Sequence, residues 1–194
     1  MPKYKVRMVF ETTEFPPVEI YGYVESNEPN MFSKEPEHQI SIICPETNFK
    51  SIDPTNISGE TNQSPIEIDY KGTVETGIVV VVTNPNNYPT SNIWFRPQVN
   101  DPLINSINVP AWVGINETAE VSSIPGDKYI NHIGSTGIVT SLVSSSLLID
   151  DNDRFDRWPM IGPGTVDFSV LSEPSGGYST RSWALEYYEM FGSL

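Results

Sequence analysis

The feature that most constrains the fold is a strict alternation of side chains that follows a glycine–proline turn. Residues 162–170 read Gly-Pro-Gly-Thr-Val-Asp-Phe-Ser-Val, so Val166, Phe168 and Val170 alternate with polar residues. Successive side chains of a strand point to opposite faces, and a period of two therefore predicts a strand with one buried face and one wet face. A turn followed by such a strand is typical of an antiparallel β-sandwich.

The same pattern of short strands between turn residues recurs along the chain. The last segment, residues 181–190, has some helical propensity, but Trp183, Leu185 and Tyr187 suit one face of a strand, and we favour a strand there. Gly22 lies within a predicted strand and indicates a bulge or a close backbone approach. The sequence therefore predicts an all-β fold, an antiparallel β-sandwich or jelly roll. The other strands are expected at residues 3–10, 18–25, 39–44, 65–70, 78–82, 93–95, 103–107, 112–115, 119–122, 128–133, 137–143 and 147–149.

The chain has the length of one good-sized domain with an additional piece. A turn is expected at residues 28–30, and a loop at residues 45–64, where Pro, Thr, Asn, Ser and Gly dominate. We place a domain boundary inside that loop. Residues 1–62 then form a small N-terminal β segment, and residues 63–194 form the sandwich.

Composition disfavours several classes of partner. The net charge is −14, with only 11 scattered basic residues, whereas nucleic-acid binding needs clustered Lys and Arg. No apolar run approaches the 18 or more residues of a membrane span, and the first residues lack the apolar core of a signal peptide. A single cysteine, Cys44, cannot form an internal disulfide, and we expect it to be a buried, inert thiol.

No motif of catalysis or cofactor binding is present. The sequence contains no G-x-S-x-G, P-loop or dinucleotide fingerprint. His38 and His132 have no Cys or His partner at ligand spacing, which disfavours a zinc site. We therefore expect no enzyme activity, no metal and no cofactor.

An acidic segment ahead of the alternating strand is the best candidate for a contact site. Asp151 and Asp153 belong to it, and Trp158 follows. The carboxylates could bind calcium, but the central Gly and terminal Glu of an EF-hand are missing, so a solvated loop is the default interpretation. Two of them could also act as a glycosidase pair. Trp158 could stack on a sugar, although most tryptophans of a sandwich belong to its core. Trp158, Asp151 and Asp153 are our candidates for contacts to a glycan or a protein partner.

Two regions together resemble a known family. Residues 18–49 place a strand, a Met-Phe-Ser-x-Glu-Pro connector and the strand QISIICP ahead of a loop. Residues 155–168 read Phe-x-x-Trp-Pro-Met-Ile-Gly-Pro-Gly-x-Val-x-Phe. This second pattern is similar to Phe-x-x-Leu-x-Pro-Gly-x-Asn-x-Ile in the distal tail proteins of long-tailed bacteriophages. Asp167 stands where that family often has Asn.

The resemblance implies a galectin-like jelly roll and a structural protein of the virion, made in the host cytoplasm. Such a protein is part of the tail tip or baseplate and links the tail tube or hub to other baseplate or receptor-binding proteins, as a homo-oligomeric ring. Family members usually carry a longer N-terminal belt domain, and we expect residues 1–62 to hold only its last strands. The edge strand at residues 3–10 is expected to pair with a neighbouring subunit.

Two other functions stay open. The jelly-roll pattern and the tryptophans are also compatible with a carbohydrate-binding module. The acidic segment is compatible with a glycoside hydrolase or lyase. We expect no contact with nucleic acid or a membrane under any of these hypotheses.

Overall fold

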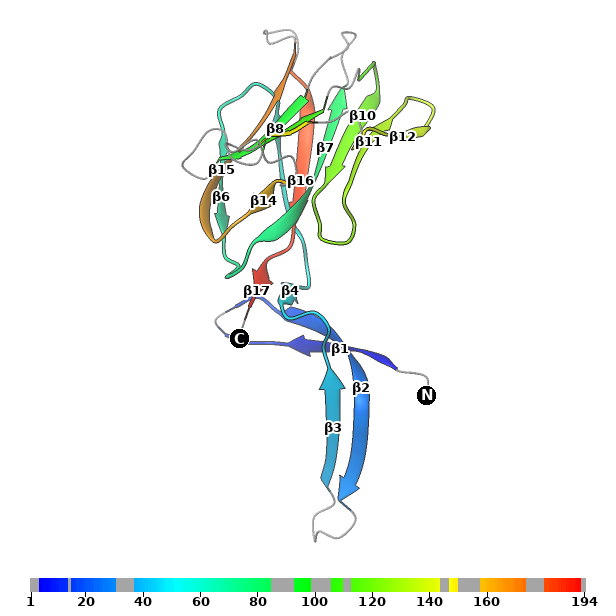
Figure 1. The fold of residues 1–194 in the computed structure, drawn as a ribbon. Helices are drawn as coiled ribbons and strands as arrows, with labels where there is room; N and C mark the ends of the chain where they lie inside the picture. The colour runs from blue at the N-terminus through cyan, green and yellow to red at the C-terminus, as the bar shows by residue number, and fades with distance from the viewer. Residues whose placement is uncertain are drawn as a thin grey trace. The chain divides into compact units, whose positions relative to one another are not determined.

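The computed structural model describes residues 4–13, 15–30, 37–84, 93–98, 106–109, 113–143, 147–149, 158–173 and 180–192. Within these ranges every regular element is a β-strand and every pairing is antiparallel, which confirms the predicted all-β class (Figure 1). None of the described residues forms a helix that is long and apolar enough to cross a membrane. The chain divides into two compact units.

Unit 1 consists of Met1–Asp53 and Met190–Leu194 and contains one five-stranded sheet. The strand order is β1-β2-β4-β17, and β3 also pairs with β2. Tyr23 pairs with Lys5 on β1 and with Ile43 on β3, so β1 and β3 lie on opposite edges of β2. The strands are β1 (Lys5–Phe10), β2 (Val18–Asn30), β3 (Glu37–Ile43), β4 (Phe49–Ser51) and β17 (Met190–Phe191).

The long strand β2 differs from the prediction. The expected turn at residues 28–30 is wrong, because these residues continue β2 and pair with residues 37–39 of β3. Pro29 is tolerated because this part of β2 has a described partner on one side only, so the missing N–H need not interrupt a ladder. The close approach expected at Gly22 is confirmed. A Cβ there would collide with the Ile42 side chain and lie 3.0 Å from the Cys44 sulfur.

Unit 2, Pro54–Glu189, contains two sheets. The first has the order β12-β11-β10-β7-β16-β5, with the short β14 paired to β7. The second has the order β13-β9-β8-β15-β6. The first sheet consists of β5 (Thr55–Glu60), β7 (Thr76–Asn84), β10 (Glu117–Ser122), β11 (Tyr129–Ile133), β12 (Val139–Ser141), β14 (Met160–Ile161) and β16 (Ser182–Tyr187). The second consists of β6 (Ile66–Tyr70), β8 (Ile93–Gln98), β9 (Ser106–Val109), β13 (Leu147–Ile149) and β15 (Gly164–Ser172).

The two sheets of unit 2 share one apolar core, which makes this unit a β-sandwich as predicted. The alternating strand is β15, whose Val166, Phe168 and Val170 are all buried. Phe168 contacts Trp183 of the opposite sheet edge-to-face, with ring centroids 5.4 Å apart. Such aromatic pairs stabilise a core by about 0.5–1.5 kcal/mol beyond the area that they bury. Ser169, which we expected on the wet face, is buried in the structure.

The loop expected at residues 45–64 is wrong, because it contains β4 and β5. β5 pairs with β16, and Gly59 lies opposite Trp183. A Cβ on Gly59 would lie 2.7 Å from the Trp183 ring, so the glycine provides the space that the indole fills. β5 is a strand because β16 supplies hydrogen bonds to its backbone, although its own composition is typical of a turn. By contacts it belongs to unit 2, whereas the expected division placed it in residues 1–62.

A polar clamp joins the two sheets of unit 2 at one end. Asn62 adopts a left-handed backbone with φ of 62° and follows Thr61, which is fully buried. The Asn62 amide donates to the Ser172 carbonyl over 3.1 Å and accepts from the Ser172 N–H over 3.0 Å. Thr61 Oγ1 accepts from the N–H of Arg181 over 3.0 Å. The clamp therefore ties the end of β15 in one sheet to the start of β16 in the other.

Burial of Arg181 lowers the pKa of its guanidinium, because desolvation disfavours the charged form. The lowered pKa agrees with the position of Arg181, which is fully buried and whose backbone N–H donates to the buried Thr61.

A carboxylate fixes the hairpin of β11 and β12. Glu117 Oε2 accepts from the Gly114 N–H over 2.6 Å and contacts His132 Nε2 over 2.9 Å. A backbone N–H from Ser135, in the hairpin turn, also helps to lower the pKa of Glu117. One side chain therefore ties the loop before β10 to β11 and to its turn.

We predict that removing the amide of the clamp destabilises unit 2. Asn62→Gly keeps the left-handed backbone and should lower the free energy of unfolding by about 1–2 kcal/mol, because the backbone N–H and carbonyl of Ser172 lose the amide of Asn62. Asn62→Ala should cost about 1 kcal/mol more, because an alanine is strained at this φ. Urea unfolding measures both. Asn56→Ala, an exposed change on β5, should stay within about 0.5 kcal/mol of the wild type, and an equal loss in this control would contradict the clamp.

We also predict a pH dependence of the Glu117 contacts. A lowered pKa in the folded state stabilises the fold above the unfolded value near 4.5, and this contribution is lost as the pH falls through the folded pKa. Glu117→Gln should therefore lower stability by about 1 kcal/mol at neutral pH and by less below about pH 4. Unfolding should also be compared in a His132→Gln background, which isolates the contribution of the Gly114 N–H. A constant difference across the acidic range would refute this.

Candidate functional site

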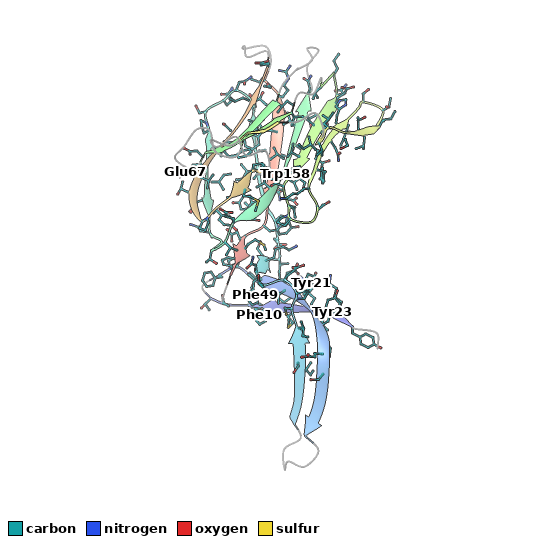
Figure 2. All side chains as sticks on the ribbon, in the orientation of Figure 1. Phe10, Tyr21, Tyr23, Phe49, Glu67 and Trp158 are labelled. Carbon is teal, nitrogen blue, oxygen red and sulfur yellow. The ribbon has the colours of Figure 1, made fainter. Side chains whose placement is uncertain are left out.

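The sheet of unit 1 buries few large apolar side chains. Among the described residues of this unit only Val18, Ile20 and Phe191 are buried large hydrophobics. Phe10 contacts Phe49 edge-to-face, with ring centroids 5.3 Å apart (Figure 2), yet Phe10 remains exposed. A sheet needs a cover over at least one apolar face, and within the described part of unit 1 no second sheet supplies one.

Exposed apolar side chains gather in unit 1. Six of the ten large hydrophobic side chains that are exposed among the described residues lie on β1, β2, β3 or next to them, although unit 1 is the smaller unit. Ile40 is 56% exposed and Ile43 is 49% exposed. Exposed apolar side chains that lie close together commonly mark a surface that binds another protein. We call this set the unit 1 apolar surface; it consists of Tyr4, Val9, Phe10, Tyr23, Ile40 and Ile43.

The strand register places these side chains on both faces of the sheet. Tyr23 lies opposite Ile43 on β3, so their side chains share one face. Phe10 lies opposite the buried Val18 and therefore belongs to the other face. An apolar surface on two faces of one sheet favours contacts with more than one neighbour.

An ion cluster fixes β1 and β4 against β2. Glu19 is buried, and its carboxylate lies 2.5 Å from Arg7 Nε on β1 and 3.7 Å from Lys50 Nζ on β4. The Glu19 carboxylate raises the pKa of the Arg7 guanidinium through its hydrogen bond and its charge. Beside this cluster Lys5 Nζ lies 4.4 Å from the centre of the Tyr21 ring. The basic residues of β1 are thus engaged within the sheet.

The outer edge of β1 carries free backbone groups. β1 pairs only with β2 among the strands that the structure describes. The Tyr4 carbonyl accepts from the Val24 N–H, so the alternation of an antiparallel ladder directs the backbone groups of Lys5, Arg7 and Val9 away from β2. These groups can pair with a strand of another molecule.

Trp158, which the sequence singled out, is not part of this surface. Trp158 is half-buried and packs against the core of unit 2, with Lys128 Nζ 5.7 Å from the centre of its ring (Figure 2). Asp151 and Asp153 lie outside the described residues. Cys44 is half-buried in unit 1 rather than fully buried. In the described ranges no group of three or more His, Cys, Asp and Glu side chains is placed to hold a metal ion.

Sequence reasoning missed the unit 1 apolar surface, although a signal was present. The segment at residues 39–43, Gln-Ile-Ser-Ile-Ile, has an apolar residue on each face of its strand. A strand that is apolar on both faces indicates burial on both faces. Nothing in the local sequence says whether the cover comes from the same chain or from another one.

Comparison with known proteins gives a strong structural likeness. No family model matches the chain, and no curated protein matches it. The chain is similar in structure to the Dit protein (gp 19.1) of phage SPP1, described as a paradigm of the hub adsorption apparatus in phages that infect Gram-positive bacteria. The TM-score is 0.60 at 10% sequence identity, over 95% of this chain and 65% of the Dit chain.

A second solved structure, that of the infectious bursal disease virus Gt strain, has a TM-score of 0.20 at 12% identity. This similarity is too low to support an argument.

The present chain spans 65% of the length of the Dit protein, slightly less than two thirds. Since the sequence identity is low, the likeness concerns the fold. In its described parts the chain has the fold of a phage distal tail protein.

Proposed function

We propose that this protein is a structural component of a bacteriophage tail tip or baseplate. It assembles with other copies through unit 1, as a ring, and links the tail tube or hub to other baseplate or receptor-binding proteins. The observation that carries the proposal is the unit 1 apolar surface, which lies on a sheet that has no covering sheet within the described part of unit 1. The likeness to the Dit protein supports the choice of a phage tail as the setting.

The chemistry of unit 1 fits an assembly role better than a role in catalysis. Its buried carboxylate, Glu19, is neutralised by Arg7 and Lys50 and is thus engaged in structure. Its exposed groups include aliphatic and aromatic side chains and backbone groups at the β1 edge, which can recognise another protein surface. Residues 1–62 would correspond to the last strands of a belt-like domain, as the family resemblance implies, and the protein would reside in the virion.

The carbohydrate-binding alternative has less support. Stacking on a sugar needs an exposed aromatic face beside polar groups. The Trp158 ring packs against the core, and Lys128 lies over it. The face of the first sheet of unit 2 that points away from the core carries small side chains, including Ser58, Thr83 and Ala184, which are exposed.

The assembly proposal predicts that charges on the unit 1 apolar surface dissociate the oligomer. We expect the wild-type protein to form an oligomer of defined size in light scattering. Ile40→Glu combined with Ile43→Glu should weaken association at least tenfold, because covering each isoleucine contributes about 1–2 kcal/mol and a buried carboxylate is costly. Circular dichroism checks that the fold is kept.

A matched control is available in unit 2. Ile115 is 46% exposed, close to the value for Ile43, and Ile115→Glu should leave the oligomer intact. A wild-type protein that stays monomeric at all concentrations, or a double variant that assembles like the wild type, would refute assembly through this surface.

A second prediction concerns Trp158. Trp158→Ala should destabilise unit 2 by about 2 kcal/mol, because the indole packs against the core. Lys128→Ala removes only the cation above the ring and should cost less than about 1 kcal/mol. Thermal and urea unfolding measure both. A Trp158→Ala variant with wild-type stability that loses binding on a glycan array would support the carbohydrate alternative instead.

A further inference from the structure

The strand β12 ends one sheet of unit 2 and is unusually open. All three of its residues are exposed, and its pairing with β11 is the only one that it makes among the described strands. Two apolar side chains in and next to the strand are well exposed, Ile138 at 69% and Val139 at 58%. Isoleucine and valine side chains are more often buried in the core of a sandwich, so the exposure of both side chains needs an explanation.

The hydrogen bonds of the hairpin show which backbone groups of β12 face outward. The Ile138 carbonyl accepts from the Gly134 N–H, and the Leu142 N–H donates to the Ile130 carbonyl. Alternate residues of an antiparallel strand pair with the same neighbour. The backbone of residues 138, 140 and 142 therefore faces β11, and that of Val139 and Ser141 faces the open edge.

The open edge lacks the usual protection against a second strand. Edge strands of soluble proteins commonly carry Lys, Pro or an inward-pointing charge that prevents pairing. Residues 133–149 contain no charged residue and no proline, in a chain that has 36 charged residues. Another edge strand, β1, carries Lys5 and Arg7, which are engaged by Tyr21 and Glu19 within the sheet, whereas β12 carries no charge at all.

The position of this edge is also fixed before any partner arrives. The hairpin turn closes with a hydrogen bond from the Gly137 N–H to the Gly134 carbonyl, and Gly137 has the φ of 82° that such a turn requires. Glu117 ties the same hairpin to the loop before β10 through Gly114 and to β11 through His132. A strand that is held in place loses little entropy when another strand pairs with it.

We propose that β12 is a docking edge for a short extended segment of another protein. The segment pairs with the outward groups of Val139 and Ser141 and extends the sheet by one strand. Its side chains at the pairing positions are uncharged and β-branched, and lysines or arginines flank them. This site lies on unit 2 and is separate from the assembly surface proposed for unit 1.

The size of the site favours a segment over a second copy of the chain. The three residues of β12 and the exposed Ile138 beside it form a small surface, whereas stable interfaces between folded proteins bury roughly 1,600 Å². A short strand gains its affinity from backbone hydrogen bonds and needs little area.

Charge explains the chemistry assigned to the flanks. The Glu117 carboxylate, which ties this hairpin in place, is engaged with Gly114 and His132 and is not available to a basic side chain at the pairing positions. The chain as a whole is strongly acidic and attracts basic groups over a Debye length. The segment is therefore neutral where it pairs and basic at its ends.

The test uses synthetic peptides with the full chain. The probe is Lys-Lys-Val-Thr-Val-Thr-Val-Lys-Lys with a fluorophore, measured by anisotropy, and the same peptide with Glu in place of Lys. We expect the lysine peptide to bind with a Kd on the order of 10–500 μM. The glutamate peptide should bind at least tenfold more weakly at low salt, and the difference should shrink as salt screens the charges.

Two changes then test the pairing itself. Ser141→Pro removes only the outward N–H and should weaken binding at least tenfold, whereas the matched control Ser141→Thr should bind like the wild type. Val139→Lys adds an edge charge without touching the backbone and should weaken binding similarly. On the peptide, N-methyl groups on one alternate set of residues should abolish binding, and on the other set they should be tolerated.

Several results would overturn the proposal. These are no binding of the lysine peptide, equal binding to wild type and to Val139→Lys, and equal tolerance of both methylation patterns. A dimer that ultracentrifugation detects in the wild type and not in Ser141→Pro, without peptide binding, would assign the edge to a second copy. The Ile40→Glu/Ile43→Glu variant should still bind the peptide, which separates this site from the assembly surface.

Discussion

A β-sheet with apolar faces is stable in water only when those faces are covered, and the two units of this protein meet this requirement in different ways. In unit 2 two sheets cover each other, and side chains such as Phe168 and Trp183 meet between them. In unit 1 the described strands form one sheet, and apolar side chains such as Tyr23 and Ile43 remain exposed. Unit 2 thus has the means to fold by itself, whereas unit 1 gains from a neighbour. The assembly role proposed for unit 1 rests on this difference.

Backbone groups at the sheet edges follow the same logic. Each edge strand presents N–H and carbonyl groups that water or another strand must satisfy. At β1, Glu19 binds Arg7 and the ring of Tyr21 contacts Lys5. A strand that pairs with β1 therefore lies beside charged side chains. At β12 no charge is present, and the only cost of pairing is to displace water. The two edges therefore suit the different partners that we propose for them, a second copy of the chain at β1 and an extended segment at β12.

The strands that carry their own alternation could be predicted from the sequence. β15 and β7 are apolar where they face the core, and the period of two is visible without any neighbour. β5 could not be predicted, because Thr-Asn-Ile-Ser-Gly-Glu has the composition of a turn and becomes a strand through its pairing with β16. The continuation of β2 through Pro29 was missed for a similar reason, since only the pairing with β3 shows that no N–H is needed there. The unit 1 apolar surface was not predicted from the sequence. Trp158, a candidate contact residue for which the sequence left a place in the core open, packs against the core in the structure, and its role in contacts stays a prediction.

The sequence by itself determined the all-β class and the antiparallel strands, because side-chain alternation and turn residues are local properties of the chain. It also determined the acidic net charge of the chain, which attracts basic groups of a partner over about a Debye length. Only the tertiary structure decided which apolar residues are covered, because alternation says that a face is apolar and not what lies against it. The same holds for the open edges, since a strand becomes an edge strand only through the absence of a neighbour on one side.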